Sequence, residues 1–163
     1  MKNQTESEKI RYEMRNEIEN IIKQKHIDRT IFHEAAKSNY EKVLRKIYYS
    51  FCDYQKYPTI EVSSYMWVRF RDGLKQTELF YVDWANWNNY INYIDQLIPE
   101  DESSVFYYLL VDGGWVYEGT LSGIKQVLYD FPAWMEDFYI TPKNYTWLIA
   151  HCEDGGCMCR VWN

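Results

Sequence analysis

Residues 134–149 read WMEDFYITPKNYTWLI, two apolar runs joined by a short polar segment. Pro142 and Asn144 mark that segment as a turn between two antiparallel strands. Both runs are apolar at nearly every second position and at several positions between. Strands with this pattern are covered on both faces, so we expect the pair to lie inside a sheet.

Two amphipathic helices precede this strand pair near the start of the chain. Residues 8–25 carry Ile and Met at spacings of three and four, the pattern of a helix with one apolar face. Asp28 is placed to start a short helical piece. Ser38 and Glu41 have the form of a capping box, which predicts a helix ending near Phe51.

The middle of the chain alternates between strand and helix patterns. Residues 66–71 and 78–82 are β-rich runs around a turn signal, which predicts a hairpin. The same reasoning predicts an inserted helix, a second hairpin and another inserted helix over residues 84–98, 105–118 and 121–131.

These elements fit one domain, since 163 residues can bury one good core. Residues 1–52 form its helical N-terminal part, and residues 66–162 form a sheet with two inserted helices. The sequence therefore predicts a single α+β domain over residues 1–163. We expect a mixed or antiparallel sheet of about six strands, packed against the N-terminal and inserted helices.

Aromatic residues make up 18% of the chain, including 16 Tyr and 7 Trp, which is more than one core of this size needs. Tyr and Trp combine an apolar body with a polar tip and are enriched at protein interfaces, so we expect some to contact a partner. The net charge of −6 argues against sequence-independent nucleic-acid binding, which depends on Lys and Arg neutralising phosphates. An acidic surface instead suits a basic partner.

The sequence shows neither a targeting segment nor a membrane segment. Its first thirty residues alternate charged residues with single Ile residues, so they lack the apolar core of a signal peptide. No apolar run reaches the roughly 20 residues that a membrane span needs. We expect a cytoplasmic protein with no membrane partner, whose four Cys are reduced thiols.

The last hairpin, over residues 145–162, contains three of the four Cys. If residues 153–156 form a four-residue turn, Cys152 lies opposite Cys157 and the thiols share one face with aliphatic residues. A structural zinc site needs four ligands, whereas this segment offers three thiols and a His that points the other way, so we predict no metal site. We expect the thiols to pack under a helix, although a Cys152–Cys157 disulfide is sterically possible.

The other face of this hairpin is the candidate site. In the same register it carries aromatic residues, Met and Arg, which are enriched at the centre of protein interfaces. The candidate partner-binding residues are Tyr145, Trp147, His151, Met158, Arg160 and Trp162. The alternative is that this face is buried under the N-terminal helices, whose apolar residues need a surface to cover.

The sequence shows no catalytic arrangement. His26, His33 and His151 are scattered and do not form a pattern of nucleophile and base. The acidic pairs at residues 136–137 and 153–154 lie beside turns or strand starts, so we expect them to be solvated. We therefore predict no catalytic residue, no cofactor and no enzymatic activity.

Two segments near the carboxyl end, GWVYEGTLSGIKQVLYDFP (residues 114–132) and MEDFYITPKNYTWLIAHCEDG (residues 135–155), carry a family resemblance. They resemble a small bacterial family broadly similar to the SMI1/KNR4-like (SUKH-type) immunity proteins, in which a short helix precedes a hairpin with a Trp-Leu-Ile strand. The matching positions are Trp115, Tyr117, Phe138, Tyr139, Ile140, Tyr145, Trp147, Leu148 and Ile149. The resemblance implies a protein that neutralises a toxin by binding it, and it brings no catalytic residues. His151 and Cys152 depart from the polar pair that often follows this strand in relatives.

These observations predict a non-catalytic cytoplasmic protein that binds a toxin-like protein partner and does not bind nucleic acid. It is expected to be a monomer or a homodimer, since the aromatic face can also close a dimer. An alternative is a small-ligand-binding or enzymatic domain with a pocket between the sheet and the helix that carries Trp84 and Trp87.

Overall fold

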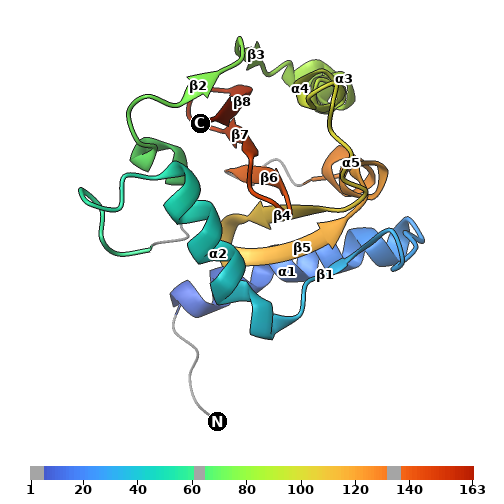
Figure 1. Cartoon of the computed structure of the whole chain (residues 1–163). Helices are drawn as coiled ribbons and strands as arrows, with labels where there is room; N and C mark the ends of the chain where they lie inside the picture. Colours follow the sequence, from blue (N-terminus) through green and yellow to red (C-terminus); the bar gives the residue numbers. More distant parts are fainter. Residues whose placement is uncertain (1–5, 61–64, 132–136) are drawn as a thin grey trace.

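The computed structural model describes residues 6–60, 65–131 and 137–163, with side chains from Tyr12 onward. Residues 134–136 of the stretch WMEDFYITPKNYTWLI lie outside these ranges. The chain folds around an eight-stranded sheet with the strand order β1-β5-β4-β6-β7-β8-β2, and β3 also pairs with β8 (Figure 1). Every pairing within the described ranges is antiparallel. The predicted fold class, α+β, is confirmed, with more strands than expected.

The strands are short. Their bounds are β1 (Phe32–Glu34), β2 (Lys75–Gln76), β3 (Phe80–Tyr81), β4 (Tyr107–Val111), β5 (Trp115–Gly119), β6 (Phe138–Pro142), β7 (Trp147–Cys152) and β8 (Cys157–Trp162). The helices are α1 (Glu6–Gln24), α2 (Lys37–Phe51), α3 (Trp87–Asn92), α4 (Ile94–Leu97) and α5 (Leu121–Tyr129). The described residues also form three short 3₁₀ helices: η1 (Met66–Arg69), η2 (Trp84–Asn86) and η3 (Asp112–Gly114).

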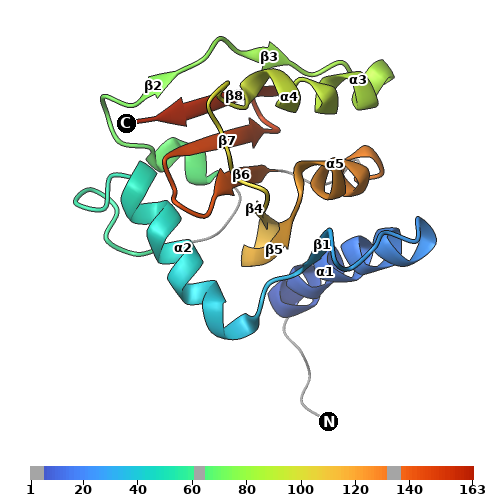
Figure 2. The same cartoon turned by 45° about the vertical axis from the view of Figure 1, so that its right-hand side comes forward.

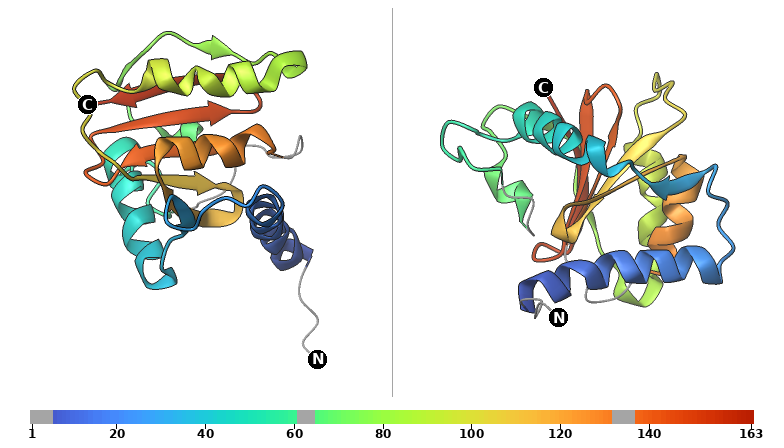
Figure 3. Two further views of the ribbon diagram at one scale, coloured as in Figure 1. Left: turned by 90° about the vertical axis from the view of Figure 1, so that its right-hand side faces the viewer. Right: turned by 90° about the horizontal axis from the view of Figure 1, so that it is seen from below.

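Helices cover both faces of the sheet, as Figure 2 and the edge-on view of Figure 3 show. Helix α2 and η1 pack on one face, and α1, α3, α4 and α5 pack on the other. Side chains alternate between the two cores along each strand, so Phe138 and Ile140 face the α1 side while Tyr139 faces the α2 side. All five residues of β6 are buried, which confirms an interior strand.

The last two strands pair as the sequence predicted. Cys152 lies opposite Cys157, and Trp147 lies opposite Trp162. Helices α1 and α2 also match their predicted ranges closely, and the Thr120 side chain caps α5 by accepting a hydrogen bond from the Gly123 amide.

Three predictions about the first half of the chain were wrong. The piece after Asp28 contains strand β1, which pairs with β5, so the N-terminal part is not wholly helical. Helix α2 begins at Lys37 with Ala36 as its N-cap, so Ser38 lies inside the helix and is not its cap. Residues 66–71 and 78–82 form no hairpin, because the first run is the 3₁₀ helix η1 and β2 and β3 each pair with β8.

Two glycines allow β1 to reach the sheet. A Cβ atom at Gly123 would lie 2.5 Å from the carbonyl oxygen of Ile31, and one at Gly119 would lie 2.8 Å from the same oxygen. That oxygen accepts a hydrogen bond from the Thr120 amide at 2.8 Å. The close approach of two backbone segments therefore requires glycine at both positions.

Within the described ranges, every helix is too short or too polar to cross a lipid bilayer.

Candidate functional site

A cleft of about 540 Å³ opens where β7 begins and β8 ends. We call it the Trp147–Trp162 cleft. It lies between these strand ends, the β6–β7 turn and the loop that follows α4. Its lining residues are Pro99, Asp101, Glu102, Ser103, Asn144, Thr146, Trp147, Arg160 and Trp162.

Trp147 fastens the loop after α4 to the sheet. Its indole Nε1 donates a hydrogen bond to Glu102 Oε2 at 2.6 Å, and its ring lies 5.8 Å from the ring of Tyr107. Because Trp147 is buried, this hydrogen bond is shielded from solvent at the donor. The loop therefore has a defined position against the aromatic floor of the cleft.

Glu102 is held ionised at the rim of the cleft. Burial opposes its ionisation, but hydrogen bonds from Ser104, Trp147 and Ser103 outweigh burial and lower its pKa. The Ser104 amide donates to Glu102 Oε1 at 2.7 Å. Asp101 beside it is exposed, so this rim presents two carboxylates to solvent.

Arg160 forms the opposite wall together with Trp162. Its Nη1 donates a hydrogen bond to the carbonyl oxygen of Leu97, the last residue of α4, at 2.8 Å. Its guanidinium carbon lies 4.9 Å from the centre of the Trp162 ring, which is a cation–π contact. Two contacts thus fix the guanidinium in place before any ligand arrives.

The lining provides recognition groups of three kinds. Trp147 and Trp162 offer ring surfaces, Arg160 offers a fixed planar donor, and Asp101 and Glu102 offer carboxylates for cations. Groups of these kinds can bind charged or planar parts of a ligand.

Three of the six predicted site residues, Trp147, Arg160 and Trp162, meet at this cleft. The prediction was wrong for His151 and Met158, which are fully buried and do not reach the surface. Trp147 is also largely buried, so it contributes a floor and Trp162 contributes the accessible ring.

His151 lies in a shell of aromatic rings. Its ring stacks on Phe138 at 4.8 Å and meets Trp87 and Tyr90 edge-on at 5.8 and 5.5 Å. Burial lowers the pKa of His151 to about 4, so the ring is neutral at physiological pH. It supports the fold from within and is unavailable to a partner.

Helix α3 and α4 cover this part of the hairpin. The alternative prediction, that the N-terminal helices bury this face, was therefore wrong about which helices cover it. Helix α1 contributes to the same core, but farther along the sheet. Tyr90, Ile91 and Ile94 are fully buried where a ligand pocket was the alternative prediction. A cavity opens instead past the end of α4, at the Trp147–Trp162 cleft.

Tyr145 belongs to the other face of the sheet. Its φ of 57° places it in the left-handed region, which breaks the alternation that a continuous strand would give. Its ring stacks on Tyr108 at 6.1 Å, on the α2 side. The prediction that it shares a surface with Trp147 was wrong for this reason.

Two of the three hairpin thiols pack on the α2 side, as predicted. Cys152 and Cys159 pack against the core that contains Val43, Ile47 and Phe51. All four cysteines are free, and in the described part of the chain no three His, Cys, Asp or Glu side chains gather as metal ligands. Burial raises the pKa of the Cys159 thiol to about 11 and also raises the pKa of Cys152. Such thiols are poor nucleophiles at neutral pH.

The prediction that Asp137 is solvated was wrong. Its neighbour Glu136, for which the same prediction was made, lies outside the described residues. Asp137 is buried and accepts hydrogen bonds from the Tyr65 amide, the Tyr139 hydroxyl and the Glu153 amide at 2.8, 3.1 and 3.0 Å. Burial raises its pKa, and these hydrogen bonds act in the opposite direction. The carboxylate ties η1 and the β7–β8 turn to the start of β6. The local signal of this role is an Asp directly before a mostly apolar strand.

Comparison with known proteins places the chain in a family. No curated protein matches it. Residues 10–161 match the model of a family of unknown function, DUF6756. Because this match covers nearly the whole described fold, including the cleft, the chain belongs to the DUF6756 family.

Proposed function

We propose that the chain is a non-catalytic cytoplasmic binding protein that neutralises a basic, toxin-like protein partner by stoichiometric binding at the Trp147–Trp162 cleft. One observation carries this proposal. The cleft places an accessible Trp ring, an immobilised Arg and two carboxylates around one concavity. Trp and Arg are the residue types that dominate the binding energy of protein interfaces.

The cleft is organised in advance of binding. Arg160 is fixed by Leu97 and Trp162, and the loop that carries Glu102 is fixed by Trp147. Ordering a side chain on binding costs free energy, so groups that are already held add more to affinity. This supports a binding role for the cleft.

The charge of the molecule supports a basic partner. The chain carries a net charge of −6, and Asp101 and Glu102 lie at the rim of the cleft. An acidic surface attracts a basic protein and speeds its association. We expect a Lys or Arg side chain of the partner to reach these carboxylates.

The resemblance of residues 114–132 and 135–155 to SMI1/KNR4-like immunity proteins supports toxin neutralisation as the purpose of binding. In that role the protein acts inside the cell that makes it. The four free cysteines agree with a reducing compartment.

Affinity purification from a host that carries the neighbouring genes tests the proposal. The wild-type chain is expected to recover a basic protein in a 1:1 complex and to protect cells that express it. The variants Trp162→Ala and Asp101→Lys are expected neither to recover the partner nor to protect the cells. Trp84→Ala is the matched control, since Trp84 is 56% exposed at the opposite end of the α3–α4 segment. The proposal would be contradicted if no toxin-like partner is recovered and the cells are not protected. It would also be contradicted if Trp84→Ala loses binding and protection as fully as the cleft variants.

A second candidate function is small-ligand binding at the same cleft. Its volume of about 540 Å³ falls within the range of small-molecule sites, roughly 300–1,000 Å³. A rise in melting temperature with a small molecule, lost in Trp162→Ala, would favour this candidate over a protein partner.

A further inference from the structure

The charge of the chain is divided unevenly. Residues 37–71 contain seven Lys and Arg against three Asp and Glu, a net charge of +4. The remaining residues contain 11 Lys and Arg against 21 Asp and Glu, a net charge of −10. The overall charge of −6 therefore conceals a basic region, and arguments from net charge do not apply to it.

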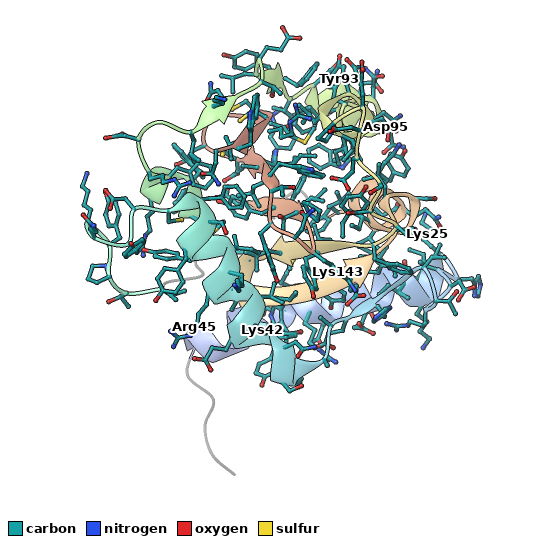
Figure 4. All side chains as sticks on the ribbon, viewed as in Figure 1. Lys25, Lys42, Arg45, Tyr93, Asp95 and Lys143 are labelled. Carbon is teal, nitrogen blue, oxygen red and sulfur yellow. The ribbon has the colours of Figure 1, made fainter. Side chains whose placement is uncertain are left out.

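The outer face of α2 forms the centre of this region. Its inner residues Val43, Ile47, Tyr48 and Phe51 are buried against the sheet. Its outer side has a shallow groove of about 580 Å³, and Figure 4 shows Lys42 and Arg45 extending from it. We call this surface the α2 basic face. The groove is lined by Ser38, Glu41, Lys42, Arg45, Lys46, Tyr49 and Ser50.

Exposed tyrosine rings border these cations. Tyr49 is 47% exposed and Tyr54 is 48% exposed, and their rings meet edge-on at 5.3 Å. Lys42, Lys46 and Tyr49 occupy successive turns on one side of the helix, since residues three and four apart are neighbours. Cations and a ring thus form a row along α2.

The cations of this face are available to a ligand. Lys42 and Lys46 are exposed, and Arg45, which is also exposed, pairs with Glu41, one helical turn away, at 2.7 Å and interacts with Tyr49. A surface ion pair of this kind contributes little stability, so a phosphate can replace the carboxylate at small cost. The face therefore offers three cations within two turns of helix.

The composition of the α2 basic face distinguishes between anionic partners. Protein interfaces are depleted in Lys, whereas Lys supplies two of the three cations here. Single-stranded nucleic acid is bound by cations along the backbone together with aromatic rings that stack on bases. Exposed Tyr rings beside a row of cations fit that ligand better than an acidic protein.

We propose that the α2 basic face binds single-stranded nucleic acid, with Lys42, Arg45 and Lys46 on phosphates and Tyr49 and Tyr54 stacking on bases. This site is separate from the Trp147–Trp162 cleft and does not depend on the function proposed for it. Binding is independent of base sequence, because every base presents a face on which a ring can stack.

Fluorescence anisotropy with a labelled oligothymidylate of about 15 nucleotides tests the proposal, since single-strand sites span up to about that length. Affinity is expected to fall as salt rises. Each phosphate contact adds about 0.7 to the slope of log affinity against log salt, so Lys42→Glu with Lys46→Glu is expected to reduce the slope by about 1.4. The double variant is also expected to bind at least about tenfold more weakly at low salt.

A matched control distinguishes the effect of the α2 basic face on affinity from the effect of net charge. Lys23→Glu with Lys75→Glu changes the net charge equally at exposed positions on α1 and β2, and it is expected to bind nearly as well as wild type. Tyr49→Ala is expected to weaken binding by about tenfold without changing the salt slope, because stacking does not involve counterions. Circular dichroism checks that each variant is folded.

Several outcomes would overturn the proposal. One is that the protein does not bind oligothymidylate at low salt. Another is that the Lys23 and Lys75 control loses as much affinity as the Lys42 and Lys46 variant. Equal or tighter binding of polyglutamate would show a site for acidic protein, and binding confined to anionic vesicles would show a membrane site. Selective binding of the single strand, lost in the double variant, supports it.

Discussion

The Nδ1 atom of His151 lies 2.7 Å from the hydroxyl oxygen of Tyr90, and this contact joins β7 to α3 in the centre of the molecule. The other ring nitrogen, Nε2, is buried and has no hydrogen-bond partner among the described residues. Protonation of His151 would place a charge in a buried shell of aromatic rings, away from water. This cost is what lowers its pKa to about 4.

We therefore expect stability to depend on pH through His151. The unfolded chain binds the proton near the ordinary pKa of about 6.5, and the folded chain binds it only near pH 4. The contribution of His151 to the free energy of unfolding is complete above about pH 6.5. It is lost as the pH falls toward 4, for a total of about 3 kcal/mol. Urea unfolding at pH 7.5 and pH 5 measures about 2 kcal/mol of this loss, before most carboxylates titrate.

A paired variant isolates this effect. His151→Phe with Tyr90→Phe replaces both hydrogen-bonding partners by apolar rings, which leaves no polar group unpaired. Its free energy of unfolding is expected to change little between pH 7.5 and pH 5. An unchanged pH dependence in the variant would show that His151 is not the cause.

Trp147→Phe is expected to release the loop that follows α4. It removes the hydrogen bond from Nε1 to Glu102, and a hydrogen bond to a charged group contributes about 1.5–3 kcal/mol, less where one partner is accessible to water. We expect a loss of about 1–2 kcal/mol in urea unfolding. The Ser104 amide should also exchange faster with solvent. Glu102→Gln keeps a hydrogen-bond acceptor and should lose less stability than Trp147→Phe. Equal losses of stability in the two variants would contradict the role given to this hydrogen bond.

Gly123→Ala is expected to destabilise the protein although alanine favours helices. The new Cβ atom would lie 2.5 Å from the carbonyl oxygen of Ile31, which must move away with β1. Overpacking of this kind costs about 1–3 kcal/mol, whereas the helical preference of Ala over Gly would add about 1 kcal/mol of stability. Urea unfolding gives the sign, with the exposed Ser122→Ala as control. A more stable Gly123→Ala would show that the two segments are not in close contact.

The sheet around β6, β7 and β8 was predictable because its signals are local. The turn residues 142–144 and the alternation on either side of residues 153–156 determine which residues face each other. The region of residues 66–82 was not predictable in this way. Met66 and Val68 alternate as in a strand, yet η1 forms there, and the two-residue strands β2 and β3 are held by β8 from far along the chain.

The candidate site was predictable only in part for the same reason. Alternation along β7 and β8 brings Trp147, Arg160 and Trp162 together. The positive φ of Tyr145 has no signal in its own residue type, since Tyr rarely adopts it. The acidic rim depends on a contact between Trp147 and Glu102, which are 45 positions apart, and no local pattern encodes that contact.

Photocrosslinking in the source cell tests the central claim most directly, that the Trp147–Trp162 cleft holds a protein partner. A photoreactive residue replaces Thr146, an exposed residue of the cleft lining, or Ser122, an exposed residue of α5 away from the cleft. We expect a single adduct with a basic protein from position 146, in a 1:1 ratio, and none from position 122. No protein adduct from position 146, or the same adducts from both positions, would contradict the claim.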